Sequence, residues 1–303
     1  MLVAVDIGNT NIVLGFLDGD TIAGTYRITT KANHTSDEYG LFLTEFLRMS
    51  GFQPSDVDDV IICSVVPKVM HSFRSSIVKF LDIDPMVVGP GIKTGMNVRV
   101  DDPKSLGADI LADCAGAYYE YGGPVLVADF GTATTFNVVD ENKVFRGGVI
   151  CPGLSTGLRA LGERCAQLPQ VHLSSPKSAI GVDTEKCMLS GSVLGTAVLL
   201  DGITQRIEEE LGRPATLVVT GGLAKYVIPL CRHPLIYDPE LLLKGLALLY
   251  QLNAPQHERH HEPRSDGERR RPRPAGRRPY NNSSSPRRRN NRRPRRDDEA
   301  KAG

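Results

Sequence analysis

The stretch Val125–Asn137, Val-Leu-Val-Ala-Asp-Phe-Gly-Thr-Ala-Thr-Thr-Phe-Asn, joins an apolar run to a carboxylate, a glycine turn and three threonines. Leu2–Phe16 repeats this order as Leu-Val-Ala-Val-Asp-Ile-Gly-Asn-Thr-Asn-Ile-Val-Leu-Gly-Phe. Each stretch is typical of a β-hairpin whose first strand delivers an aspartate to a turn rich in Gly, Thr or Asn. A single turn of this kind is common in proteins and would not by itself indicate a site. Because two occur at corresponding places, we interpret them as the halves of one composite site.

The elements around the two hairpins repeat as well. Apolar periodicity and turn residues predict strands and helices in the same order in both parts of the chain. The first part is expected to contain strands at 2–6, 12–16, 21–27, 59–64 and 85–88 and helices at 36–50 and 68–81. The second is expected to contain a hairpin at 125–137, strands near 144–150 and at 215–220, and helices at 106–121, 153–165, 184–211 (broken near Gly195), 223–228 and 239–252. This repetition predicts an internally duplicated α/β fold.

Charge and composition divide the chain of 303 residues into a body and a tail. Pro255–Gly303 contains 15 Arg and one Lys against seven acidic residues, a net charge of +9, although the whole chain has only +1. A segment so poor in apolar residues cannot offset its ordering entropy, so we expect a disordered tail. We therefore expect one half at residues 1–118, a second at 119–254 and an Arg-rich tail at 255–303.

The composition also limits the class of protein. No run reaches the roughly 18 apolar residues of a membrane span, and the first residues enter a strand without the basic segment of a signal peptide. The six cysteines form no Cys-x-x-Cys pair, so neither a zinc site nor a disulfide framework is indicated. We therefore expect a protein of the reducing cytoplasm.

The residues of the two turns suit phosphate. Glycine lets the backbone approach an anion, Thr and Asn donate hydrogen bonds to its oxygens, and a nearby carboxylate can hold a cation. A late Thr220-Gly221-Gly222 would let a purine or ribose approach the backbone. The chain has no Gly-x4-Gly-Lys-Ser/Thr loop, so we expect a nucleoside triphosphate clamped between two hairpins rather than a P-loop site.

This layout resembles the actin-like, sugar-kinase and heat-shock ATPase fold, which has two ribonuclease H-like halves with mixed five-stranded sheets flanked by helices. Within that fold, Asp6–Asn11 and Asp129–Phe136 resemble type III pantothenate kinases. Further similar stretches are Gly107-Ala108-Asp109, Gly147–Gly153, Leu168-Pro169 and Asp201-Gly202. The similarity extends over about residues 1–252 and leaves out the tail.

The resemblance implies a kinase that phosphorylates pantothenate with ATP, the first step of coenzyme A biosynthesis. It implies a homodimer, Mg²⁺ bound with ATP, and a monovalent cation, K⁺ or NH₄⁺, at Asp129. It implies that Asp109 is the catalytic base. The implied ATP-binding residues are Asp6, Ile7, Gly8, Asn9, Thr10, Asn11, Ile12, Val13 and Thr132. The implied substrate-binding residues are Gly107, Ala108, Asp109, Ile110 and Thr184.

General chemistry fits these roles but leaves alternatives open. Phosphoryl transfer depends on positioning and charge neutralisation, and a carboxylate at a helix start can accept the proton of an alcohol. The same position also suits an aspartate favoured by the helix dipole. Asp129 is equally suited to capping a turn, and Thr184 follows Asp183 at a helix start, where capping alone explains it.

Two positions depart from the resemblance. Ile110 replaces an expected Arg after Gly-Ala-Asp, and Val100 replaces an expected Tyr. An Arg offers a fixed charge for a carboxylate or phosphoryl group, and Ile does not; Arg99 or Lys104 is a candidate substitute. The alternative function is a catalytically weakened or inactive member acting as a nucleotide-binding, transcription-accessory regulator. The tail arginines are expected either to attract nucleic acid non-specifically or to form a solvated extension without a dedicated partner.

Overall fold

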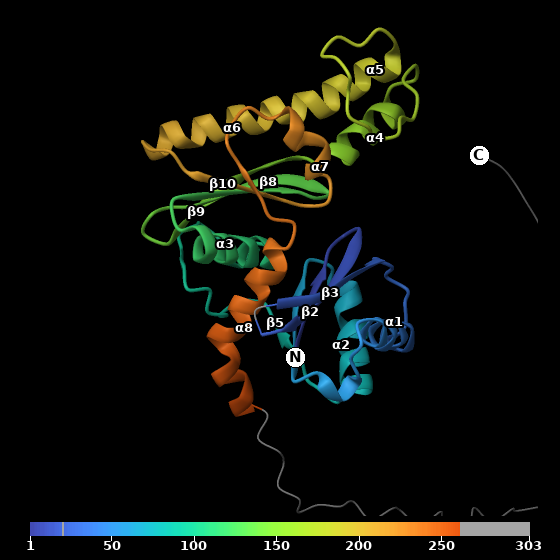
Figure 1. Cartoon of the computed structure of the whole chain (residues 1–303), viewed down its shortest axis with the longest axis vertical. Helices are drawn as coiled ribbons and strands as arrows, with labels where there is room; N and C mark the ends of the chain where they lie inside the picture. The colour runs from blue at the N-terminus through green and yellow to red at the C-terminus, as the bar shows by residue number, and fades with distance from the viewer. Residues whose placement is uncertain (20, 261–303) are drawn as a thin grey trace, which may run out of the picture. The chain divides into compact units, whose positions relative to one another are not determined.

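The computed structural model describes residues 1–19 and 21–260, and the first 261 residues form one compact unit. Its first sheet has five strands in the order β3-β2-β1-β4-β5, in which β1 pairs antiparallel with β2 and parallel with β4 (Figure 1). The strands are β1 (Leu2–Ile7), β2 (Asn11–Asp18), β3 (Thr21–Thr29), β4 (Asp59–Ser64) and β5 (Met86–Val87).

The second sheet repeats this order and adds one strand. Its order is β11-β10-β7-β8-β9-β6, so β9-β8-β7-β10-β11 matches the first sheet strand for strand. The sixth strand, β6, comes from the segment that links the two parts and pairs parallel with β9. The strands are β6 (Asn97–Val98), β7 (Val125–Phe130), β8 (Ala133–Val139), β9 (Val144–Pro152), β10 (Thr216–Thr220) and β11 (Ile236–Tyr237).

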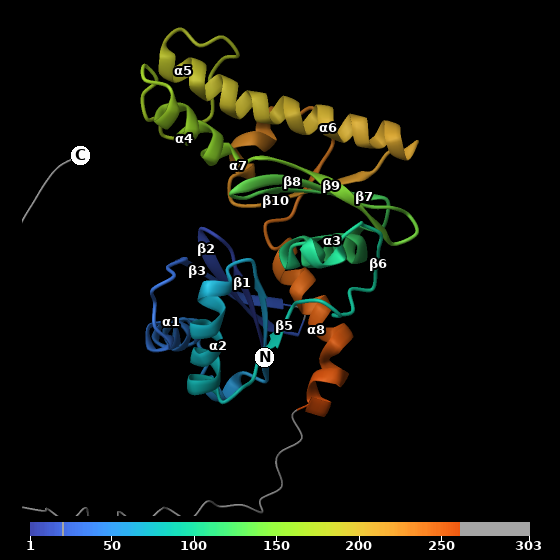
Figure 2. The ribbon, with the colours of Figure 1, turned by 180° about the vertical axis from the view of Figure 1, so that it is seen from behind.

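Helices cover both faces of each sheet (Figures 1 and 2). In β1, Val3, Val5 and Ile7 are buried with residues of α1 and α2, while Ala4 is buried with residues of α8. This division follows from the alternation of side chains along a strand. The helices are α1 (Ser36–Met49), α2 (Pro67–Leu81), α3 (Ala108–Tyr121), α4 (Leu154–Arg164), α5 (Thr184–Leu189), α6 (Gly195–Leu211), α7 (Ala224–Val227) and α8 (Leu241–His260).

Helices α3 and α8 pack closely against each other and connect the two sheets. Their backbones approach so closely that a Cβ placed on Gly245 would lie 2.0 Å from the carbonyl oxygen of Ala112. Glycine at this crossing therefore allows a close contact between α3 and α8 that a side chain would prevent. Because α3 also packs on the second sheet and α8 on the first, this crossing sets how α3 lies against the first sheet.

The α5–α6 region forms the outer layer of the second sheet. A π-helical turn at Ser190–Leu194 lies where the sequence predicted a break near Gly195. Within the described residues, this 28-residue stretch, Thr184–Leu211, is the one helix long and apolar enough to cross a membrane. That is weak support for a span, because Val193, Ala197 and Leu200 are fully buried against the second sheet, as in the core helix of a globular protein.

The predicted α/β duplication is confirmed, with small differences at the edges. The first sheet has the five strands expected. The second has six, because the short strand β6, which was not predicted, adds one. The short β11 was not predicted either. The last helix runs to His260 and so includes the first residues of the expected tail. The remainder of that tail, residues 261–303, lies outside the described residues, and the boundary at 118/119 stays a prediction.

Candidate active site

The two hairpin turns meet each other in the structure. Asp6 lies near the end of β1 and Asp129 near the end of β7, which are equivalent strands in the two sheets. Beyond them, the hydroxyl oxygens of Thr10 and Thr132 lie 3.0 Å apart, within hydrogen-bond distance. The sequence prediction that Asp6–Val13 and Thr132 contribute to one site is therefore geometrically consistent, because residues 122 positions apart come into contact.

The carboxyl groups of the two strand ends are held in an environment that resists ionisation. The pKa of Asp6 is raised to about 8, first by burial and then by the negative charges of Asp109 and Asp129, while Arg27 opposes the rise. The pKa of Asp129 is raised to about 7 by burial and by Asp109. These mutual effects place Asp109, the predicted base, in one electrostatic group with the two strand-end aspartates.

Sequence reasoning missed a fourth member of this group, Asp113. It lies four residues after Asp109 on α3, is 5% exposed, and its Oδ1 has no hydrogen-bond partner. Burial raises its pKa well above the usual value, followed by the charges of Asp129 and Asp109. The signal was present in the sequence, because residues four apart on a helix lie on the same face.

Asp109 lies in the first turn of α3 and is half-buried. Its Oδ1 accepts a hydrogen bond from the backbone N–H of Ile110 at 2.9 Å. A Cβ placed on Gly107 would be 2.3 Å from that same Oδ1, so the carboxylate needs a glycine at this position. Gly107, Ala108 and Asp109 thus form one local unit at the start of the helix.

The sequence predicted that Gly221 lets a ligand approach its backbone closely. In the structure, Gly221 lies close to Asp129. Its backbone has φ +91°, and an added Cβ would lie 2.5 Å from Asp129 Oδ1. A side chain at 221 would therefore be strained and would also collide with the carboxylate. The predicted approach of a purine or ribose to this glycine stays a prediction.

The oxygen ligands around the two turns suit hard cations. Carboxylate and hydroxyl oxygens are the ligands that Mg²⁺ and alkali ions prefer, and the buried Oδ1 of Asp113 has no hydrogen-bond partner. Within the described part of the chain, no three His, Cys, Asp or Glu side chains come together as a metal-binding group.

Thr184 does not join this group within one chain. It is exposed at the first position of α5, where Asp183 caps the helix by accepting a hydrogen bond from the N–H of Lys186 at 2.8 Å. Helix α6 lies on one face of the second sheet and α3 on the other, while α5 lies beyond the sheet and packs with α4 (Figures 1 and 2). Thr184 and Asp109 therefore lie on helices that belong to different packing clusters.

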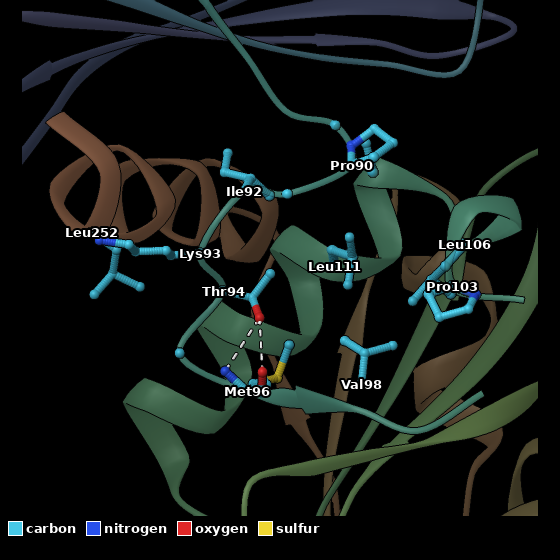
Figure 3. A pocket seen from close by; sticks show the side chains of 14 residues that line it. Pro90, Ile92, Lys93, Thr94, Met96, Val98, Pro103, Leu106, Leu111 and Leu252 are labelled. Carbon is cyan, nitrogen blue, oxygen red and sulfur yellow. Dashed lines mark hydrogen bonds between the residues drawn. The ribbon is translucent and has the colours of Figure 1, made fainter. Parts of the chain in front are cut away.

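A cavity of about 740 Å³ lies beside the start of α3, where Ala108 and Leu111 form part of its wall (Figure 3). Its other walls come from the link between the sheets and from Leu252 of α8, and its residues are mostly apolar. Neither the turns nor the four aspartates line it. Its lining also includes Lys93 and Thr94, but it contains none of the predicted phosphate-binding residues, so the turns and the aspartates remain the candidate site.

A family model described as type III pantothenate kinase matches residues 2–206. The chain belongs to the type III pantothenate kinase family. Among its relatives named type III pantothenate kinase, one from Bifidobacterium longum (strain NCC 2705) is 68% identical over 257 residues, covering 84% of this chain and 99% of the relative. One from Listeria monocytogenes serotype 4b (strain CLIP80459) is 40% identical over 259 residues, covering 86% and 100%.

Solved structures share the fold at low sequence identity. One, from Campylobacter jejuni and assigned to the Baf family of transcriptional activators, has a TM-score of 0.52 at 17% identity and covers 84% of this chain and 99% of its own. Another, from Sinorhizobium meliloti and assigned as a 2-dehydro-3-deoxygalactonokinase, has a TM-score of 0.52 at 12% identity and covers 83% and 98%. These likenesses support the actin-like α/β fold.

In this type III pantothenate kinase family member, the two departures from the expected pattern lie in the same apolar environment. Ile110 and Val100 are both half-buried and pack against the cluster that contains Cys114, Val127 and Phe145. Each is an apolar side chain at a position where the resemblance leads us to expect a polar one, and each packs against this cluster. Both positions therefore belong to the apolar packing around α3.

Proposed function

We propose that this chain transfers the γ-phosphoryl group of ATP to the primary alcohol of pantothenate, giving ADP and 4′-phosphopantothenate in the first step of coenzyme A biosynthesis. Family membership over residues 2–206 carries the proposal. The group formed by Asp6, Asp109 and Asp129 beside the touching turns supports it. The reaction uses ATP, and we expect it in the cytoplasm.

On the nucleotide side, we propose that Asp6–Val13 and Thr132 bind the phosphates of ATP. Thr10 and Thr132 carry hydroxyl groups that already meet between the turns. Mg²⁺ would accompany ATP near Asp6, and K⁺ or NH₄⁺ would lie at Asp129; these ions would neutralise charge that phosphates add. The raised pKa values of both aspartates support this assignment, because a nearby cation would favour their ionised forms.

On the acceptor side, we propose that Asp109 orients the hydroxyl group of pantothenate and accepts its proton as the oxygen attacks the γ-phosphorus. The bond between that phosphorus and the β–γ bridging oxygen then breaks, and ADP leaves. Gly107, Ala108 and Ile110 would border the acceptor. Since Ile110 offers no charge for the carboxylate of pantothenate, we expect weaker acceptor binding than in a family member that has an Arg at this position and a pocket that holds it.

We also propose that the active protein is a homodimer. Thr184 lies on α5, which packs with α4 and not with α3, so we expect a substrate-binding role for Thr184 to involve a second copy of the chain. Large apolar side chains are exposed on or near α5 and α6, including Ile180 (81%), Val182 (82%) and Val198 (62%). Exposed apolar side chains are suited to association, and sedimentation analysis of Val198→Asp against the unmodified chain tests it.

A second candidate function is a nucleotide-binding regulator that no longer phosphorylates pantothenate. The observation that favours it is the apolar packing of Ile110 and Val100, the two positions that depart from the family pattern. In that case the nucleotide side would remain functional without a matching acceptor side.

One experiment separates the two functions. The full chain is assayed with ATP, Mg²⁺, K⁺ and pantothenate, and ATP binding is measured by calorimetry on the same sample. We expect turnover that Asp109→Asn lowers by about 10²–10⁴-fold while ATP still binds. ATP binding without any turnover would favour the regulator. Turnover that Asp109→Asn leaves unchanged would reject Asp109 as the base.

A further inference from the structure

Each hairpin turn is held from behind by a threonine of the segment that follows the third strand of its sheet. Thr30 comes directly after β3, and its hydroxyl group donates to the carbonyl oxygen of Gly8 at 2.7 Å. Thr156 follows β9 in the first turn of α4, and its hydroxyl group donates to the carbonyl oxygen of Thr132 at 2.8 Å. Strands β3 and β9 are equivalent in the two sheets, so the two threonines come from corresponding places, although Thr156 bonds the residue after Gly131, which is the counterpart of Gly8.

The spacing in the chain supports this equivalence. Thr30 is 22 residues from its acceptor in the first turn, and Thr156 is 24 residues from its acceptor in the second. Each of these separations along the chain corresponds to the number of residues in the second and third strands and their connecting turns. The contacts therefore follow from the repeated topology and recur in both halves of the duplicated fold.

The two hydrogen bonds of Thr30 determine the direction of the first turn. Besides its hydroxyl bond to Gly8, the backbone N–H of Thr30 donates to the carbonyl oxygen of Thr10 at 2.9 Å. A planar trans peptide directs its C=O and its N–H to opposite sides. The N–H groups of Asn9 and Asn11 therefore point away from Thr30, which is the orientation that a phosphate-binding turn needs.

The second turn is held in a corresponding way. The carbonyl oxygen of Thr132 is bound by Thr156, while the hydroxyl group of Thr132 meets that of Thr10 across the site. Gly153 lies close behind, because an added Cβ there would be 2.3 Å from the same carbonyl oxygen. The backbone of each turn is thus fixed on its outer side, and the hydroxyl groups meet on the inner side.

We propose that Thr30 and Thr156 are a pair of positioning residues for phosphoryl transfer, one for each turn. Neither belongs to the phosphate-binding stretches, and each acts by holding a carbonyl group out of the site so that donors remain directed toward the γ-phosphate. This inference rests on the proposed kinase function. Because precise placement of reacting groups has a large effect on rate, the loss of either hydroxyl group changes ATP use more than pantothenate use.

The test replaces each hydroxyl group by a methyl group of similar size, in Thr30→Val and Thr156→Val, and restores it in Thr30→Ser and Thr156→Ser. We expect each valine variant to raise the KM for ATP by about 5–10-fold, which corresponds to one lost hydrogen bond. The KM for pantothenate should change by less than about twofold, and the serine variants should recover most of the ATP affinity. ATP calorimetry supplies the same comparison without turnover.

Thr44→Val is the matched control, because the hydroxyl group of Thr44 donates to the carbonyl oxygen of Gly40 at 2.9 Å within α1, away from the turns. Valine variants that leave the KM for ATP unchanged, or that change both KM values equally without rescue by serine, would overturn the inference. If one valine variant does not fold, the serine variant at that position and both variants at the other threonine still test the inference. An unmodified chain without turnover would instead reject the kinase function and leave ATP calorimetry to test the positioning role.

Discussion

At the two hairpin turns, polar groups face one another, whereas at the start of α3 the neighbours of Asp109 are apolar. The hydroxyl groups of Thr10 and Thr132 meet at 3.0 Å, and the turns are held by further threonine hydrogen bonds. Beside Asp109, Ile110 and Val100 pack into an apolar cluster. One region therefore presents the groups that phosphate needs, and the other has apolar side chains at two positions where polar ones were expected.

This difference shows that the two sides of the proposed site depend on different parts of the fold. Each turn is fixed by a threonine hydrogen bond from its own part of the chain, so we expect the turns to tolerate change elsewhere. The position of Asp109 depends on how α3 packs against α8 and the second sheet. Variants that move α3, change its apolar neighbours or change the charge around it test the comparison from different directions.

The largest effect is expected at the crossing of α3 and α8. Gly245→Ala would place a Cβ 2.0 Å from the carbonyl oxygen of Ala112, so the helices must separate. We expect the free energy of unfolding to fall by about 2–3 kcal/mol, as for overpacked cores. Turnover should fall because α3 carries Asp109, while each turn keeps its own hydrogen bonds. Urea unfolding and the kinase assay measure both effects.

Gly202→Ala is the matched control for this variant. Gly202 also lies within a helix, α6, but an added Cβ there meets no atom within 4 Å. The change should therefore be neutral or stabilising by up to about 1 kcal/mol, since alanine favours helix. Equal stability of the Gly245 and Gly202 variants would contradict the close crossing.

The next effect concerns the apolar replacement itself. Ile110→Arg would introduce a guanidinium group into the cluster that Ile110 and Val100 share. We expect a loss of about 1–2 kcal/mol in stability, because a half-buried charge lacks a partner there, and no improvement in the KM for pantothenate. Leu41→Arg, at a position 63% exposed on α1, is the control and should be nearly neutral. A lower KM with unchanged stability would show that the acceptor side still accommodates an arginine.

Much of the fold was predictable because it follows from local patterns. The apolar runs before Asp6 and Asp129 and the glycine turns after them predicted both hairpins, and the strand order of the first sheet repeats in the second. Long amphipathic stretches such as Ser36–Met49 gave the helices. Short β6 and β11 have two residues each, too few to show the alternation on which strand prediction depends.

The parts of the site that the sequence did not predict depend on contacts between distant segments. Asp113 shows helical spacing from Asp109, but its burial is visible only once α3 is packed. The contact of Thr30 with Gly8 depends on the pairing of β2 with β3, and that of Gly221 with Asp129 depends on the pairing of β7 with β10. Residue types alone indicated phosphate chemistry, while tertiary packing decides which carboxyl groups share one environment.

A smaller effect is expected from pH, through the buried aspartates. The pKa of Asp6 is raised to about 8 in the folded chain, and that of Asp113 is raised by burial and neighbouring charges. The folded state therefore holds protons that the unfolded state has released above about pH 4. Without nucleotide or cations, the contribution of these aspartates to the free energy of unfolding should be largest below about pH 4 and fall as the pH rises toward about 8.

Asp113→Asn tests this dependence. It removes one charge from the group, so we expect a gain on the order of 1 kcal/mol at pH 8 and a shallower decline between pH 5 and 8. Urea unfolding at several pH values measures it, with Asp101→Asn at an exposed position as the control. A decline as steep as that of the unmodified chain would show that Asp113 is not part of the charged group.

The smallest effect is expected from Arg27, the one cation that opposes the raised pKa of Asp6 among the influences on that carboxyl group. Arg27 pairs in register with Val13, which pairs with Asp6, so all three side chains share one face of the first sheet. Arg27→Gln should raise the pKa of Asp6 further and move the acid limb of kcat/KM for ATP to higher pH. Because Arg27 is exposed, its contribution is screened, and we expect less than about a fivefold change in the KM for ATP. Arg48→Gln, which breaks an exposed pair with Glu45 on α1, should leave the profile unchanged. If the pH profiles of Arg27→Gln and Arg48→Gln are identical, Arg27 does not contribute to the pKa of Asp6.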